Sequence, residues 1–259
     1  MSVWLIYNKE DCEINKFAIN KYISSFEKRG IGCLLVLSHE YLDKDYLPTA
    51  VINRTNNFVI SEYFETKGIP CFNNSTVTKI CNDKSKTYSH FAKDIPYLPV
   101  YEIDENSNLT FPCIIKSRSG RGGKQVFLVN SLKEIYDYKK YIPDLLIQNF
   151  LPNAIDIRTY VINNMPVVSI ERKPNVGFKA NYKINHNAQL VNLNDEQIKI
   201  INKVIEKEHF DYVGIDILTD GENSYLSEIE DSVGARSVYD LTNIDIIDMY
   251  VEHIISSIK

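Results

Sequence analysis

Residues 112–129, PCIIKSRSGRGGKQVFLV, decide the fold, because two apolar strands here flank a glycine-rich turn. The turn leaves backbone N–H groups bare, which suits a phosphate, at three glycines: Gly120, Gly122 and Gly123. It is not a Walker A loop, since Gln125 rather than Ser or Thr follows Lys124. A strand rather than a helix follows it, which excludes the dinucleotide fingerprint. An ordinary hairpin loop is the alternative interpretation.

Lys116 ends the first of these strands, where a partly buried ammonium needs an anionic partner. A lysine in this position commonly extends its ammonium into solvent instead. Beside a glycine-rich loop, the phosphates of ATP are the better partner. We therefore predict that Lys116 and the loop bind ATP together.

Three carboxylates follow on the two strands of a later hairpin, which turns around Asp220-Gly221. Glu228 and Glu230 are two residues apart and therefore point to one face, with Asp216 opposite or diagonal to Glu228. Like charges this close are costly without a cation, and oxygen-only ligands favour Mg²⁺ or Mn²⁺ held jointly with phosphates. The alternative is an edge face exposed to solvent.

The strands between the loop and the hairpin supply positive charge. Asp156 and Arg158 share one face of the first of them, and the next strand ends at Arg172. Each arginine alone is typical of a surface salt bridge. Together with Lys116 they could complement a triphosphate and a developing acyl phosphate.

The order of elements changes along the chain. Up to about residue 72, strands alternate with helices, which predicts a small parallel sheet with helical crossovers. Residues 76–93 are expected to form one helix. After Pro99, strands dominate, and residues 195–207 and 244–258 are expected to form helices.

Composition excludes several classes of protein. The chain has 259 residues, enough for one or two domains, and a net charge of −5 that argues against nucleic-acid binding. Its five dispersed cysteines are typical of reduced thiols rather than disulfides or a zinc site. We find neither a signal peptide nor an apolar run long enough to span a membrane. We therefore expect a cytoplasmic protein with no membrane or nucleic-acid partner.

The ordered series of these motifs resembles the ATP-grasp ligases, in particular the RimK-like ones, from about Asn53 to the C-terminus. The series also includes Asn82-Asp83-Lys84, Gln148-Asn149-Phe150-Leu151 and Phe178-Lys179-Ala180-Asn181. The resemblance implies an α/β and α+β protein with the ATP-grasp fold, in which two α+β subdomains sandwich ATP behind a small α/β domain. The implied boundaries are 1–78 for the α/β domain and 79–259 for the ATP-grasp domain, divided into 79–147 and 148–259.

The resemblance also implies roles for individual residues. The nucleotide would be bound by Lys84, Lys116, Ser119, Gly120, Gly122, Gly123 and Asp156, and by a hinge that reads adenine, formed by Gln148, Asn149, Phe150 and Leu151. One or two Mg²⁺ ions would be held by Asp216, Glu228 and Glu230. The γ-phosphate or acyl phosphate would meet Arg158, Arg172 and Asn181.

The implied activity is an ATP-dependent carboxylate–amine ligation through an acyl phosphate, on small-molecule or peptide substrates, in a chain that could form a homo-oligomer. Glu230 departs from the family pattern, which has Asn at this position. His186 could orient substrate or act as a base, and Arg236 could clamp a substrate carboxylate. Two alternatives stay open: a non-catalytic nucleotide-binding regulatory module, and a small-molecule kinase on the same scaffold.

Overall fold

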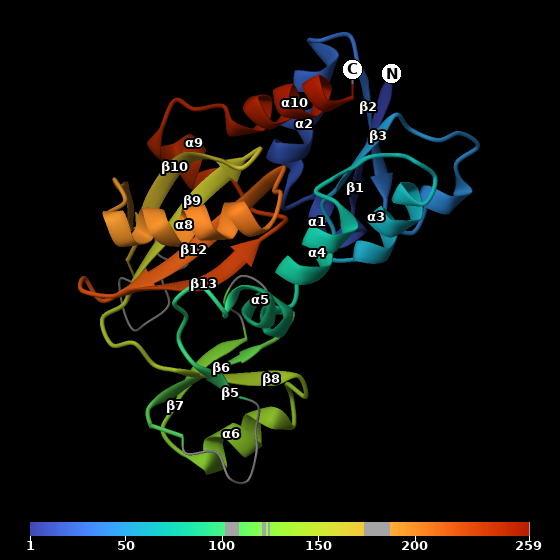
Figure 1. Ribbon diagram of the computed structural model, residues 1–259. Helices are drawn as coiled ribbons and strands as arrows, with labels where there is room; N and C mark the ends of the chain where they lie inside the picture. Colours follow the sequence, from blue (N-terminus) through green and yellow to red (C-terminus); the bar gives the residue numbers. More distant parts are fainter. Residues whose placement is uncertain (102–108, 121–122, 124, 174–186, 259) are drawn as a thin grey trace.

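The computed structural model describes residues 1–101, 109–120, 123, 125–173 and 187–258. Strands within these ranges form three sheets, and helices pack against them (Figure 1). In the same ranges, no helix combines the length and apolar character that crossing a membrane requires.

The first sheet is parallel, in the order β2-β1-β3-β4, as the alternating pattern predicted. Its strands are β1 (Ser2–Tyr7), β2 (Gly32–Leu37), β3 (Ala50–Asn53) and β4 (Cys71–Phe72). Its helical segments are α1 (Lys9–Cys12), α2 (Lys16–Glu27), η1 (Tyr41–Asp43) and α3 (Phe58–Glu65). Because β1 and β3 are parallel neighbours, Tyr7 and Asn53 end at the same edge of the sheet.

The prediction of a single helix over residues 76–93 is wrong. The structure has two helices, α4 (Ser75–Cys81) and α5 (Lys84–Phe91). Asp83 between them is extended, and its carboxylate accepts hydrogen bonds from the backbone N–H groups of Ser85 and Lys86. An aspartate that caps a new helix this way competes with continuation of the preceding one.

The second sheet is antiparallel, in the order β5-β8-β6-β7, and contains the strand that carries Lys116 next to its end. Its strands are β5 (Val100–Tyr101), β6 (Cys113–Ser117), β7 (Val126–Val129) and β8 (Leu145–Asn149). Helix α6 (Leu132–Lys139) covers one face, where Ile135 packs with Ile115 and Ile147. This layer lies at the opposite end of the molecule from the C-terminal helix (Figure 1).

The third sheet is antiparallel, in the order β11-β10-β9-β12-β13. Its strands are β9 (Ile155–Ile162), β10 (Met165–Arg172), β11 (Ala188–Leu190), β12 (Tyr212–Thr219) and β13 (Ser224–Glu230). The predicted helices are present as α8 (Asp195–Lys207) and α10 (Ile246–Ser257), and a short α9 (Arg236–Leu241) was not predicted. The hairpin turns where expected, with Gly221 at a φ of 99° that favours glycine.

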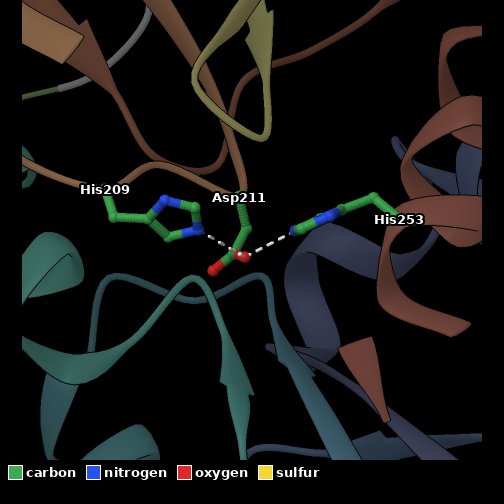
Figure 2. Close-up of side chains that lie close together, drawn as sticks. All are labelled: His209, Asp211 and His253. Atoms are coloured by element: carbon green, nitrogen blue, oxygen red, sulfur yellow. Dashed lines mark hydrogen bonds and ion pairs between the residues drawn. The ribbon is translucent and has the colours of Figure 1, made fainter. Parts of the chain in front are cut away.

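A cluster of His209, Asp211 and His253 joins α10 to the start of β12 (Figure 2). The Nε2 atoms of His253 and His209 lie 2.7 Å and 3.5 Å from one Asp211 carboxylate oxygen. Two ligands of a tetrahedral zinc ion would be about 3.4 Å apart, so the 2.7 Å contact is a direct hydrogen bond rather than a metal-ligand pair. The cluster therefore stabilises the attachment of α10.

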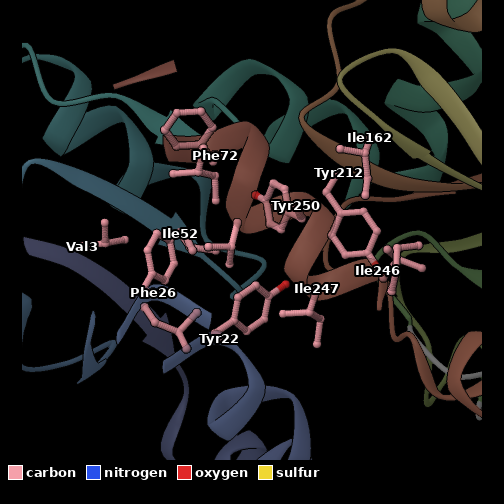
Figure 3. Packing of buried hydrophobic residues seen from close by; sticks show 14 of the residues in the cluster. Val3, Tyr22, Phe26, Ile52, Phe72, Ile162, Tyr212, Ile246, Ile247 and Tyr250 are labelled. Atoms are coloured by element: carbon pink, nitrogen blue, oxygen red, sulfur yellow. The ribbon is translucent and has the colours of Figure 1, made fainter. Parts of the chain in front are cut away.

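The largest core cluster contains residues from both the first and the third sheet, together with the helices that pack on them (Figure 3). Tyr22 of α2, Tyr250 of α10 and Tyr212 of β12 form a row, with ring centroids 6.1 Å and 4.9 Å apart. Aromatic pairs at such separations add to the energy of apolar burial. Helices α2 and α10 consequently join the layer of the parallel sheet to the five-stranded sheet.

The His253→Ala variant should lose about 1–3 kcal/mol of unfolding free energy, because Asp211 is only 7% exposed and loses its closest hydrogen-bond partner. The His209→Ala variant is the matched control, because its side chain is 55% exposed and its contact is longer. It should change stability by less than about 0.5 kcal/mol. Urea unfolding measures both, and equal losses in the two variants would contradict this account.

Candidate functional site

A cavity of about 700 Å³ lies where the three sheets approach one another. The carboxyl edge of the parallel sheet contributes Tyr7 and Arg54. Helix α5 contributes Lys84, and the glycine-rich turn contributes Ser119 and Gly120. The five-stranded sheet contributes four charged residues: Arg158, Arg172, Glu228 and Glu230. The segment that leads into α9 and residues at the start of α2 also line the cavity.

The three hairpin carboxylates lie together, as the predicted register requires. Asp216 on β12 is paired directly with Glu228 on β13, next to a register shift between Asp216 and Ile217. Each of Asp216, Glu228 and Glu230 offers an oxygen within 4.8 Å of the others. Three oxygens at this separation form a set that a hard divalent cation could use.

Asp216 is buried between two guanidinium groups. Arg158 donates from Nε and one terminal nitrogen to its two oxygens at 2.7 Å and 2.6 Å, and Arg172 donates at 2.9 Å. Burial alone would raise the pKa of Asp216, but the two guanidiniums more than reverse this effect, so its pKa lies below the ordinary value. Asp216 is therefore held as a carboxylate.

The outer groups of this network are Glu230 and Asp156. The remaining terminal nitrogen of Arg158 lies 2.7 Å from a Glu230 oxygen, and Arg172 donates to both oxygens of Asp156 at 2.7 Å. Burial raises the pKa of Asp156 despite its contact with Arg172, with the Asp216 charge acting in the same direction. The Nε of Arg172 is buried and has no hydrogen-bond partner in the described part of the chain.

The two predicted lysines differ in their partners. Lys84 Nζ donates to the carbonyl of Gly120 at 2.7 Å and lies 2.9 Å from a Glu228 oxygen. Lys116 Nζ donates to the Tyr88 hydroxyl at 2.5 Å and to Gln148 Oε1 at 2.9 Å, both neutral. Burial, assisted by the charge of Lys84, lowers the pKa of Lys116 to about 7.

Other predicted residues lie beside the cavity or outside the described ranges. Gln148 is committed to Lys116 and to the Leu98 carbonyl. The predicted residues that do not line the cavity are Lys116, Gly123, Gln148, Asn149, Phe150, Leu151, Asp156 and Asp216. Arg236 lines it as the exposed first residue of α9. Gly122, Asn181 and His186 lie outside the described residues.

Sequence reasoning missed Arg54, Tyr88 and Tyr212. Arg54 had a usable signal, because it directly follows a buried strand of a parallel sheet, and ligands bind at the carboxyl ends of such strands. Tyr88 occupies one of the positions of a helix that are spaced for burial, so it looks like a core residue in the sequence. Only the fold brings its hydroxyl to Lys116. Tyr212 begins a buried strand and gives no sequence signal at all.

Comparison with known proteins agrees with this arrangement. A family model described as a RimK-like ATP-grasp domain matches residues 97–254. An uncharacterized protein of Mycoplasma pneumoniae, the MG011 homolog, is 27% identical over 245 residues, which cover 90% of this chain and 85% of that protein. A probable alpha-L-glutamate ligase 2 of Hahella chejuensis is 23% identical over 79% of this chain and 72% of its own.

Solved structures show the same fold. The D-alanine–D-alanine ligase of Bacillus anthracis complexed with ATP has a TM-score of 0.77 at 14% identity and covers 100% of this chain and 97% of its own. A RimK domain protein of Sphaerobacter thermophilus has a TM-score of 0.74 at 16% identity, with 98% and 100% covered. The ATP-grasp fold expected from the motifs is thus confirmed, and ATP-dependent ligation is the general activity that these likenesses support. The family match spans more than half of the sequence, and the chain belongs to the RimK-like ATP-grasp family.

Proposed function

We propose that the protein is an ATP-dependent, Mg²⁺-dependent carboxylate–amine ligase that forms an amide bond through an acyl phosphate and releases ADP and phosphate. One observation carries the proposal. Three carboxylates within 4.8 Å of one another face Lys84, Arg158 and Arg172 beside a glycine-rich turn. Alternating charges of this kind suit a metal–triphosphate complex, which carries both signs.

The residues present fit both the metal and the nucleotide. Asp216, Glu228 and Glu230 would hold Mg²⁺ or Mn²⁺, which would offset phosphate charge when bound. Lys84, Lys116 and the turn (Ser119, Gly120, Gly122 and Gly123) would bind the phosphates, and the segment 148–151 would read adenine. Asp156 belongs to the same proposed nucleotide-binding set. The present contacts support this assignment, since each carboxylate already attracts cationic groups and Arg172 Nε has no partner in the described ranges.

The reaction needs two displacements. A substrate carboxylate oxygen attacks the γ-phosphorus of ATP, and ADP leaves. The amine nitrogen then attacks the carbonyl carbon of the acyl phosphate, phosphate leaves, and the amine loses a proton to a base or to solvent. Arg158, Arg172 and Asn181 would stabilise the charge that develops at the phosphoryl and acyl groups, a role that is typically worth 10²–10³ in rate per donor.

His186 would orient the amine or accept its proton, and Arg236 would contact a substrate carboxylate. The relatives named alpha-L-glutamate ligases make L-glutamate the first amine to test.

The decisive experiment is ADP release measured against pools of amines and carboxylates. Release that requires both an amine and a carboxylate supports the ligase. Release without an amine supports a kinase on this scaffold, and nucleotide binding without turnover supports a regulatory module. Either of the last two results contradicts the proposal.

The Glu228→Gln variant should lose most turnover, because it removes a metal-binding carboxylate and the ion-pair partner of Lys84. The Glu230→Asn variant is the matched comparison, since it restores the residue typical of the family and keeps an oxygen ligand. It should retain measurable activity with a raised metal requirement. A Mg²⁺ titration of ADP release in each variant provides the test, and wild-type behaviour of Glu228→Gln at every concentration would refute the metal site.

ATP affinity should fall as pH rises above 7, because the bound phosphates favour charged Lys116 whereas the free protein loses that proton near pH 7. The decrease should approach about tenfold per pH unit until the pKa of the bound state is reached. Binding should therefore take up a proton, which calorimetry in two buffers with different ionisation enthalpies detects. In Lys116→Met both effects should vanish, and their persistence there would assign them to another group.

A further inference from the structure

Arg54 lies at the end of the cavity to which the parallel sheet contributes, and its surroundings are unusual. It directly follows β3, and its backbone N–H donates to the Ile6 carbonyl of β1 at 2.9 Å, which fixes the start of the side chain. Its guanidinium reaches the segment after β13. There it donates to the Val233 carbonyl at 2.6 Å and approaches the Asp231 carbonyl at 3.5 Å.

No carboxylate of the described residues forms an ion pair with this guanidinium. Its neighbours are aromatic: its central carbon lies 5.8 Å from the centroid of the Tyr212 ring, and Tyr7 and Tyr22 line the same cavity. The cavity arginines Arg158 and Arg172 contrast with it, because each contacts two carboxylates. Arg54 is partly buried, and its Nε is fully buried. A charge in this position that meets only carbonyl dipoles and rings remains costly until an anion joins it.

Three buried polar atoms around the same place have no hydrogen-bond partner in the described structure: Arg54 Nε, the Tyr212 hydroxyl and the Ser232 hydroxyl. All three residues line the cavity, and Tyr212 is 1% exposed. Most buried polar groups in proteins have a partner, so three orphans in one place require an explanation. Each of these atoms can donate a hydrogen bond, and together with the guanidinium they match an oxyanion.

We infer that Arg54, Tyr212 and Ser232 bind a substrate carboxylate that is not consumed in the reaction. This inference rests on the proposed ligase function, because it identifies which substrates the cavity selects. Arg54 donates a hydrogen bond to the carbonyl of Val233, which lies three residues after Glu230. The alpha carbons of Glu230 and Val233 are therefore at most about 11 Å apart. The anion site therefore lies close to the carboxylate cluster but is built from different residues.

The carboxylate has two chemical sources: the second acid group of a dicarboxylate donor, or the free carboxylate of an amino-acid acceptor. A simple monocarboxylate donor paired with an amine that has no carboxylate would leave this site empty. Such a pair is therefore excluded as the preferred substrates. In either case Arg54 determines specificity and takes no part in phosphoryl transfer.

Calorimetric titration of the whole protein tests the inference with four probes. Glutarate represents the donor source and glycine the acceptor source, and dimethyl glutarate and glycine methyl ester lack the carboxylate. Arg54→Met should weaken binding of glutarate or glycine by about tenfold or more, and which of the two responds identifies the source. Binding of the esters should not depend on Arg54.

Two further variants keep the test independent of folding. Tyr212→Phe retains the buried ring and removes only the orphan hydroxyl, so it should weaken the same probe by about two- to tenfold. Arg29→Met is the control, because Arg29 pairs with Asp248 at 2.8 Å and does not line the cavity, and it should bind every probe as the wild type does.

Wild-type affinity for both carboxylate probes in Arg54→Met, or failure of the wild-type protein to bind either probe, would overturn the inference. Amine-dependent ADP release is measured in parallel to separate the two proposals. If Arg54-dependent binding occurs without ligation, the ligase proposal fails and the anion site stands. If ligation occurs and Arg54→Met leaves both binding and KM unchanged, the anion site fails and the ligase stands.

Discussion

The buried carboxylate of Asp216 between Arg158 and Arg172 is the interaction on which the rest of the site depends. It joins three neighbouring strands, β12, β9 and β10, by their side chains as well as their backbones. Removing one partner from such a network typically costs about 3–5 kcal/mol, because a buried charge is left uncompensated. Two of these groups, Arg158 and Arg172, also line the cavity, so the charges proposed for catalysis are part of the network that holds the strands in register.

The cations in the cavity and beside it are of two kinds, and the difference suggests how the roles are divided. Arg158, Arg172 and Lys84 contact carboxylates, so their charge is already offset and they can exchange partners when a metal–nucleotide complex binds. Arg54 and Lys116 contact only neutral groups among the described residues. Burial lowers the pKa of Lys116, so this residue can lose its charge. The guanidinium of Arg54 stays charged. An anionic ligand is therefore worth most at these two positions.

Glu230 occupies the position at which the motif resemblance implies asparagine. It adds a negative charge to a cluster that already holds two carboxylates. The structure offsets that charge with the terminal nitrogen of Arg158, 2.7 Å from the Glu230 oxygen. Both Arg158 and Glu230 line the cavity, so this substitution changes the charge near the site without leaving a carboxylate unpaired.

The sequence by itself determined the strands around the glycine-rich turn, a hairpin that places Asp216 opposite or diagonal to Glu228, and the order of motifs, because these depend on neighbours close along the chain. It could not determine the break between α4 and α5, where the Asp83 side chain caps a helix that apolar spacing alone would continue. Nor could it place Arg54 beside Tyr212 and Val233, residues 158 and 179 positions further on. Such contacts arise only when the parallel sheet packs on the five-stranded sheet, since burial and charge compensation are properties of the assembled core.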